Sequence, residues 1–170
     1  GFASIMRVSK NGRKAMWRTK LLYTLTLGAA LFILLHGTAF LILTHSYDIG
    51  FLDAPIQSMP RFSDIEDSMT VGEYLAAYEA VSLLGYLLTS IVTAAFSTIC
   101  GKQLSAVVCS FLLIGVPHFV RILGVIGANI IDYCDMLTPQ NAVGDLLSRI
   151  LCLIAALMLT VLSYRKWVRK

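Results

Sequence analysis

Four long runs of apolar residues, separated by polar segments, set the organisation of the chain. The runs cover residues 21–44, 80–100, 104–123 and 150–164. A helix crosses the hydrocarbon core of a bilayer with about 20 predominantly apolar residues. The pattern therefore predicts an all-α integral membrane protein with four transmembrane helices.

Polar side chains interrupt two of these runs. His36, in the first run, is expected to form a hydrogen bond with a neighbouring helix rather than to act as a proton relay. The third run contains Pro117, where we expect a kink, followed by His118 and Arg121. Two interpretations of Arg121 stay open: it reaches water at the outer interface, or it faces a polar cavity together with His118.

The composition agrees with a lipid environment. Hydrophobic residues make up 57% of the chain and charged residues only 14%, whereas a typical soluble domain has about 25% charged residues. The mean hydropathy is +0.75. A chain with so many apolar side chains needs lipid as their solvent, which excludes a soluble enzyme.

The charges between the runs segregate by side. In the segments 1–20, 101–103 and 165–170 every charged residue is basic. All ten acidic residues lie in the segments 45–79 and 124–149. Basic loops stay in the cytoplasm by the positive-inside rule. We therefore expect a multi-pass protein whose two termini are both cytoplasmic and whose acidic segments are outside.

The outer segment 45–79 contains two local signals. Pro55 and Pro60 favour extended or turned backbone, and Thr70 with Glu73 forms a capping-box pattern. The second helix is therefore expected to begin near Val71 and to project outward from the apolar run 80–100 by about two turns.

Two further features of the outer segments have plain interpretations. The acidic cluster Asp64, Glu66 and Asp67 lacks the glycine and the ligand spacing of a calcium loop, so we expect a solvated face. The segment 124–149 is too apolar for a free loop and too interrupted for a transmembrane helix. Ile126, Ile130 and Ile131 would suit a short helix or re-entrant turn there, in the outer interface.

The chain contains no motif of enzymatic chemistry that we could identify. Gly101-Lys102 lacks the upstream glycine and the hydroxyl residue of a phosphate-binding loop, and neither an HExxH nor a GxSxG pattern occurs. The four cysteines, which show no CxxC pair and no histidine at ligand spacing, are Cys100, Cys109, Cys134 and Cys152. We therefore expect no catalytic residue, no metal, no cofactor and no nucleic-acid partner.

The N-terminal segment 1–20 has the pattern of a basic amphipathic helix, with an expected break at Asn11-Gly12. Its apolar and basic residues of interest are Phe2, Ile5, Met6, Arg7, Lys10, Arg13 and Lys14. One interpretation is a surface anchor that binds anionic lipid. The other is a docking element for a cytoplasmic partner.

The order of features in SIMRVSKNGRKAMWRTKLLYTL favours the second interpretation. A short apolar helix, a Ser-Lys-Asn-Gly-Arg break and a lysine that opens a long apolar helix resemble the region between the second and third spans of ABC-2-type transporter permeases, especially the larger ones of Gram-positive bacteria. PIQSMPRF and MTVGEYL resemble the outer segment of that group. The resemblance covers most of the chain in pattern and order.

The resemblance implies a transmembrane permease component of an ATP-driven exporter in a bacterial cell membrane. In that family six spans form one domain, two such domains form the translocation path, and a separate ATPase docks on a coupling helix. The chain would then be a fragment with the last four spans, docking its ATPase through residues 2–14, with residues 126–147 as the outer re-entrant element. The implied partners are an ABC ATPase subunit, a second identical or different permease subunit, and lipid.

A different class of function fits the same residues. The chain could be a self-contained four-helix membrane protein, such as a sensor, an immunity protein or an assembly factor. Its acidic outer segment 45–79 would then be the recognition surface.

Overall fold

The chain is all-helical in a computed structural model that describes residues 10–46, 49–62, 69–123, 132–137 and 146–169. The four long helices are α2 (Lys10–Ser46), α3 (Val71–Ile99), α4 (Gln103–Ile122) and α6 (Leu146–Arg169). Each is long and apolar enough to cross a membrane. The prediction of an all-α chain with four candidate spans is confirmed.

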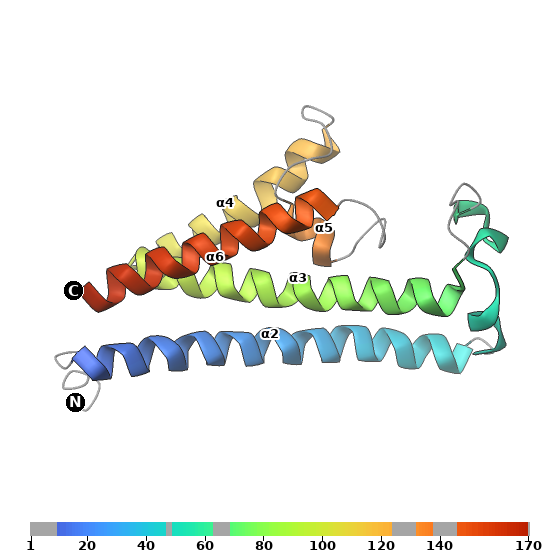
Figure 1. Cartoon of the computed structure of the whole chain (residues 1–170), viewed down its shortest axis with the longest axis horizontal. Helices are drawn as coiled ribbons and strands as arrows, with labels where there is room; N and C mark the ends of the chain where they lie inside the picture. The colour runs from blue at the N-terminus through green and yellow to red at the C-terminus, as the bar shows by residue number, and fades with distance from the viewer. Residues whose placement is uncertain (1–9, 47–48, 63–68, 124–131, 138–145, 170) are drawn as a thin grey trace.

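Helix α3 is the centre of the fold. It lies antiparallel to α2 along most of its length, and it also contacts α4, α6 and the short helix α5 (Tyr133–Leu137) (Figure 1). Small residues allow this close packing: Ser82, Gly85, Ala94 and Ala95 of α3 are all buried. The small residues of the second apolar run therefore serve helix contacts.

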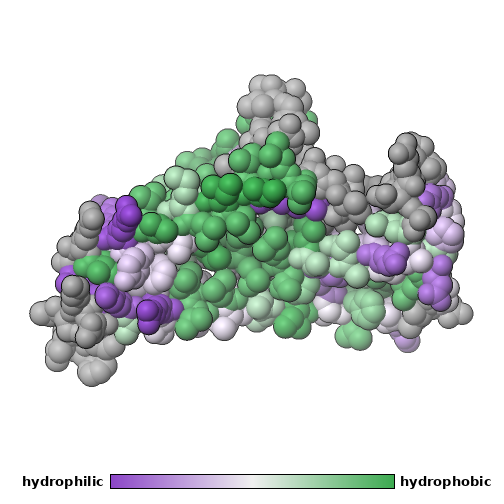
Figure 2. Space-filling view, viewed as in Figure 1, coloured by the Kyte–Doolittle hydropathy of each residue, from purple (hydrophilic) through white to green (hydrophobic). Residues whose placement is uncertain are grey.

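The surface of the helices is strongly apolar between two hydrophilic ends (Figure 2). Large side chains such as Ile33 and Leu41 of α2 are each 67% exposed. Only 6% of the most apolar part of α2 is buried within the chain. Lipid or another subunit is therefore needed to remove this surface from water.

Hydrogen bonds join the start of α2 and the end of α3 to the end of α6, which is basic. The Trp167 Nε1–H donates to the Arg13 carbonyl at 2.9 Å, and the Lys166 ammonium donates to the Ile99 carbonyl at 2.7 Å. The second bond satisfies one of the orphan carbonyls at the end of α3. We call this region, with the start of α2 and the ends of α3 and α6, the basic end of the bundle.

The capping box at the start of α3 is confirmed. The Glu73 backbone N–H donates to Thr70 Oγ1 at 3.2 Å, and the Thr70 N–H donates to Glu73 Oε2 at 2.9 Å. The helix begins at Val71 and runs without interruption to Ile99. The local pattern was sufficient because both bonds join residues only three positions apart.

Three short 3₁₀ helices connect α2 to α3: η1 (Ile49–Asp53), η2 (Ile56–Ser58) and η3 (Pro60–Phe62). An isolated antiparallel bridge fixes this connection, since the Ile56 N–H donates to the Met69 carbonyl at 3.0 Å and the Val71 N–H to the Ala54 carbonyl at 2.9 Å. The acidic cluster Asp64, Glu66 and Asp67 lies outside the described residues.

The expected break at Asn11-Gly12 is wrong. Both residues lie in the first turn of α2, which continues unbroken from Lys10 to Ser46. Asn11 and Gly12 interrupt no intrahelical hydrogen bond by their N–H groups, because the first N–H groups of any helix have no partner within it. Adding residues to a helix that has already formed is also favourable. Residues 10–14 are therefore an extension of the first candidate span.

The helix ends also differ from the ends of the apolar runs. Helix α6 begins at Leu146 and ends at Arg169, whereas the fourth run covers 150–164. Charged residues mark the ends of the segment that can lie in the hydrocarbon core. They do not end the helix itself, because long basic side chains near a helix end extend toward water. The hydropathy pattern therefore located the spans but underestimated the lengths of α2 and α6, whereas α4 matches its run to within one residue at each end.

Helix α5 is an internal element rather than a surface loop. Tyr133 and Met136 are almost completely buried and pack with Leu88 and Val92 of α3. The Tyr133 hydroxyl donates to the Cys152 carbonyl of α6 at 2.8 Å. The residues on which the sequence placed a short helix or re-entrant turn, Ile126, Ile130 and Ile131, lie outside the described residues, and the short helix seen in this segment covers 133–137. Its depth in a membrane stays a prediction.

Candidate functional site

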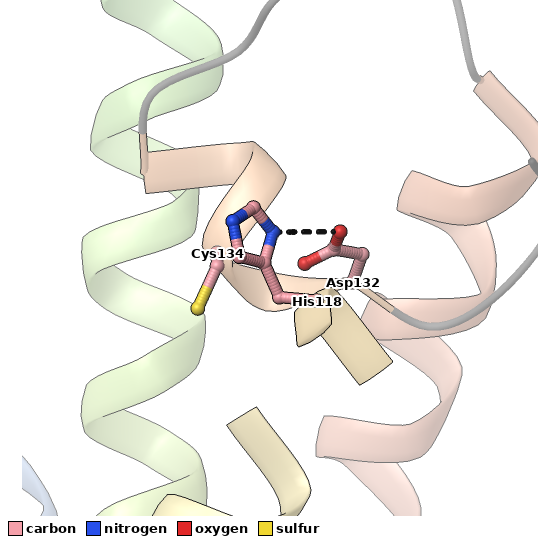
Figure 3. A group of neighbouring side chains, drawn as sticks. All are labelled: His118, Asp132 and Cys134. Atoms are coloured by element: carbon pink, nitrogen blue, oxygen red, sulfur yellow. Dashed lines mark hydrogen bonds and ion pairs between the residues drawn. The ribbon is translucent and has the colours of Figure 1, made fainter. Parts of the chain in front are cut away.

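The sharpest convergence of polar side chains lies where the end of α4 meets α5. His118 Nδ1 lies 3.1 Å from Asp132 Oδ2, and the Cys134 thiol belongs to the same group (Figure 3). One ligand-type atom from each residue lies within 4.8 Å of the other two. The three residues thus bring an imidazole, a carboxylate and a thiol to one place.

Asp132 is held in position by the start of α5. The Asp135 backbone N–H donates to Asp132 Oδ1 at 3.1 Å, the contact by which an aspartate caps a helix. The side chain of Asp132 is only 2% exposed, whereas that of His118 is 31% exposed. One carboxylate oxygen therefore serves the helix and the other faces His118.

Cys134 contacts α4 near Pro117. Its thiol donates to the Ile114 carbonyl at 3.4 Å. Pro117 lies inside α4 and has no N–H to donate to the Leu113 carbonyl four residues earlier, and Cys134 donates to the next carbonyl along the helix. Burial raises the pKa of the Cys134 thiol, and the charge of Asp132 adds to this effect. The thiol is accordingly a neutral donor here. The kink at Pro117 stays a prediction.

A second polar contact joins α2 to α3. His36 Nδ1 lies 2.8 Å from Glu79 Oε2, with the imidazole stacked on the Phe32 ring at 4.6 Å between centroids. The Tyr86 ring meets the imidazole edge-on at 5.6 Å. His36 thus bonds to a neighbouring helix, in agreement with the interpretation that the sequence favoured.

A groove of about 420 Å³ lies beside this pair. Tyr78, Glu79 and Tyr86 form its α3 side, and Phe40 and His36 belong to its α2 side. Apart from the imidazole, carboxylate and hydroxyl groups, its walls are apolar. Such a composition is typical of a pocket that orients an amphipathic molecule through a few polar groups.

The aromatic residues at the basic end hold helices together. Trp17 Nε1–H donates to Ser163 Oγ at 3.3 Å, and its ring meets Tyr164 edge-on at 5.2 Å. The Lys20 ammonium lies 6.0 Å from the centroid of the Trp167 ring, at the limit of a cation–π contact. Trp17 and Trp167 therefore join α2 to α6 in addition to any role at a membrane interface.

The structure describes only part of the predicted docking segment. Arg13 and Lys14 lie in α2, and Lys10 begins it, but Phe2, Ile5, Met6 and Arg7 lie outside the described residues. Arg121 belongs to α4 by its backbone, and its side chain is also outside the described part. Both interpretations of Arg121 therefore stay open.

Three residues of these sites were not singled out by sequence reasoning: Glu79, Asp132 and Cys134. Glu79 stands at the border of the second apolar run, where a charge is unremarkable. Asp132 had a signal that was overlooked, because Asp132 and Asp135 flank the start of a short helix in the way an N-cap does.

Comparisons with protein-family models, with curated proteins and with solved structures found no match to this chain. What is established is an all-helical chain with four helices long and apolar enough to span a membrane.

Proposed function

We propose that the chain is a transmembrane permease component of an ATP-driven exporter, which forms part of the substrate path and docks a separate ATPase through residues 2–14. ATP hydrolysis belongs to that ATPase subunit. The two termini face the cytoplasm, and a second permease subunit completes the path. The resemblance of the N-terminal and outer segments to ABC-2-type permeases motivates this proposal.

The observation that carries the proposal is the burial of α5 among α3, α4 and α6. A connection between two simple membrane anchors would run over the surface. Non-helical backbone at membrane depth is tolerated only where protein or water satisfies it, and transporters place such broken elements around their paths. An internal short helix between the third and fourth spans is therefore a feature that favours a transporter over a plain anchor.

The shape of α2 supports a mechanical link. The helix has 37 residues, which corresponds to a length of about 55 Å. It contains residues 10–14 of the docking segment and also His36, which contacts Glu79 of α3. A push on residues 10–14 would be transmitted along this one helix to the opposite half of the bundle.

The exposed apolar surface of α2 supports a second permease subunit. Leu22, Ile33 and Leu41 are all more than half exposed. In a two-domain permease, part of this surface faces the partner domain and part faces lipid.

Co-purification tests the proposal. The complete protein is co-expressed with each ABC ATPase found by searching the genes around its own, as wild type and with Ile5→Ala and Met6→Ala together. We expect the double variant to recover less ATPase at an unchanged yield in the membrane fraction, because the spans supply insertion by themselves. Lys10→Arg is the matched control, since it keeps the charge and should keep the association.

Two results would count against the proposal. Recovery of the ATPase unchanged by the two alanines would leave residues 2–14 as a lipid anchor. Failure of the wild-type protein to recover any ATPase would favour a self-contained membrane protein.

A further inference from the structure

We propose that His118, Asp132 and Cys134 bind one divalent transition-metal ion of the zinc class. This inference does not depend on ATPase association. It concerns only the junction between α4 and α5.

The distances fit such an ion. His118 Nδ1 and Asp132 Oδ2 are 3.1 Å apart, and two ligands at about 2.0–2.1 Å from a tetrahedral zinc ion are separated by about 3.3 Å. The Cys134 sulfur lies within 4.8 Å of both atoms. In a tetrahedral site with a Zn–S distance of about 2.3 Å, the sulfur lies about 3.5 Å from each of the other two ligands, so it would have to approach by about 1.3 Å at most.

The ligand types select the class of metal. Imidazole, carboxylate and thiolate are the three side-chain ligands that zinc uses, whereas magnesium and calcium prefer oxygen alone. Three protein ligands leave a fourth position for water or for an incoming group. Cobalt has similar preferences and is therefore a suitable spectroscopic substitute.

The surroundings orient the ligands as metal sites require. The Asp135 N–H holds Asp132 Oδ1 and thereby directs Oδ2 toward His118. Such outer contacts fix the direction of a metal ligand. Asp132 is almost completely buried, while His118 is partly exposed and offers a route of entry.

Binding would exchange one interaction of the thiol for another. Cys134 now donates its S–H to the Ile114 carbonyl at 3.4 Å. On coordination the thiol loses this proton to solvent and the sulfur bonds the metal as a thiolate. Because His118 belongs to α4, Cys134 to α5, and Asp132 directly precedes α5, the ion would cross-link the two helices beside Pro117.

The test is cobalt titration of the purified full chain in detergent, after removal of any histidine tag. We expect a sulfur-to-cobalt charge-transfer band that saturates at one ion per chain. Zinc should abolish the band, and a large excess of magnesium should not. Cys134→Ser should remove the band, while Cys109→Ser, the matched control in α4, should keep it. His118→Ala removes a direct ligand and should therefore weaken cobalt binding by more than the roughly 10–100-fold that loss of an outer-shell partner costs.

A second measurement uses the wild-type protein and so does not depend on folding of a variant. Maleimide labelling is read at each cysteine by peptide mapping, with and without zinc. Zinc should slow labelling of Cys134 several-fold relative to Cys109. Absence of a charge-transfer band in the wild type, a band that survives in Cys134→Ser, or equal labelling of Cys134 with and without zinc would each overturn the site.

Discussion

At the scale of the residue, His36 of the first apolar helix has its partner on a neighbouring helix. The His36 imidazole faces the Glu79 carboxylate at 2.8 Å, and the imidazole is only 13% exposed. A histidine and a glutamate that leave water separately would lose their hydration without compensation, so their contact favours the association of α2 with α3. Interhelical polar contacts in membranes nevertheless contribute only about 0.6 kcal/mol on average and at most about 1.7 kcal/mol.

A double-mutant cycle measures this contact. For His36→Ala and Glu79→Ala we expect a coupling free energy of about 0.6–1.7 kcal/mol in reversible unfolding from mixed micelles. The control cycle pairs Glu79→Ala with Thr38→Ala, because the Thr38 hydroxyl bonds only to carbonyls of its own helix. A His36–Glu79 coupling no larger than the control would show that the pair does not hold the two helices together.

The cap of α3 gives a second prediction for a single residue. Thr70→Ala removes the oxygen that accepts the Glu73 N–H, which should destabilise the first turn of α3 by about 1 kcal/mol. Hydrogen exchange at residues 71–74 should become about fivefold faster, since 1.4 kcal/mol corresponds to about tenfold. Thr93→Ala, in the middle of α3, should leave the exchange of residues 71–74 unchanged. Equal exchange in Thr70→Ala and wild type would contradict the role of the cap.

At the scale of the element, the position of α5 depends on one glycine of α3. A Cβ atom at Gly85 would lie 2.6 Å from the Met136 carbonyl carbon and oxygen, which are backbone atoms and cannot move alone. The absence of a side chain at residue 85 is therefore what lets α5 pack against α3. The same glycine explains how a short helix fits inside the bundle.

Gly85→Ala should displace α5 and destabilise the chain by about 1–3 kcal/mol, the usual cost of overpacking. Gly37→Ala is the control, because a Cβ at that position meets nothing within 4 Å. Thermal unfolding in detergent should separate the two variants, and maleimide should label Cys134 faster in Gly85→Ala only. If both variants unfold at the wild-type temperature, the contact between α3 and α5 does not limit stability.

At the scale of the whole molecule, the two ends of the bundle differ in charge. The described residues of the basic end include Arg13, Lys20 and Lys166. At the opposite end, Asp53 lies in the connection between α2 and α3, and Glu73 lies in the first turn of α3. The apolar belt between the ends is the surface that lipid would cover (Figure 2). This separation gives the topology a direct test.

Single cysteines report the side on which each end lies. In a background with the four native cysteines replaced, Asp53→Cys and Lys102→Cys both introduce exposed thiols. A membrane-impermeant maleimide added to intact cells should label position 53 only, and position 102 should react after the membrane is opened. Labelling of both positions from the same side would refute the proposed topology.

The sequence by itself determined the features that depend on near neighbours. The four apolar runs located the four candidate spans, because the length of an apolar stretch alone decides whether a helix can cross a bilayer. The Thr70–Glu73 pattern located the start of α3, because both capping bonds lie within one turn. The prediction of a break at Asn11-Gly12 was wrong because residues that disfavour a helix have little effect in the first turn of a long one.

The tertiary structure alone decided which distant residues meet. Asp132 contacts His118, which is 14 positions away in the sequence, and Cys134 contacts Ile114, which is 20 positions away. The periodicity of side chains along one helix does not predict the angle at which the next helix packs against it. That angle follows from the fit of side chains over whole interfaces, such as α5 against Gly85. The spans could therefore be predicted from composition, whereas the polar site between α4 and α5 required the packed bundle.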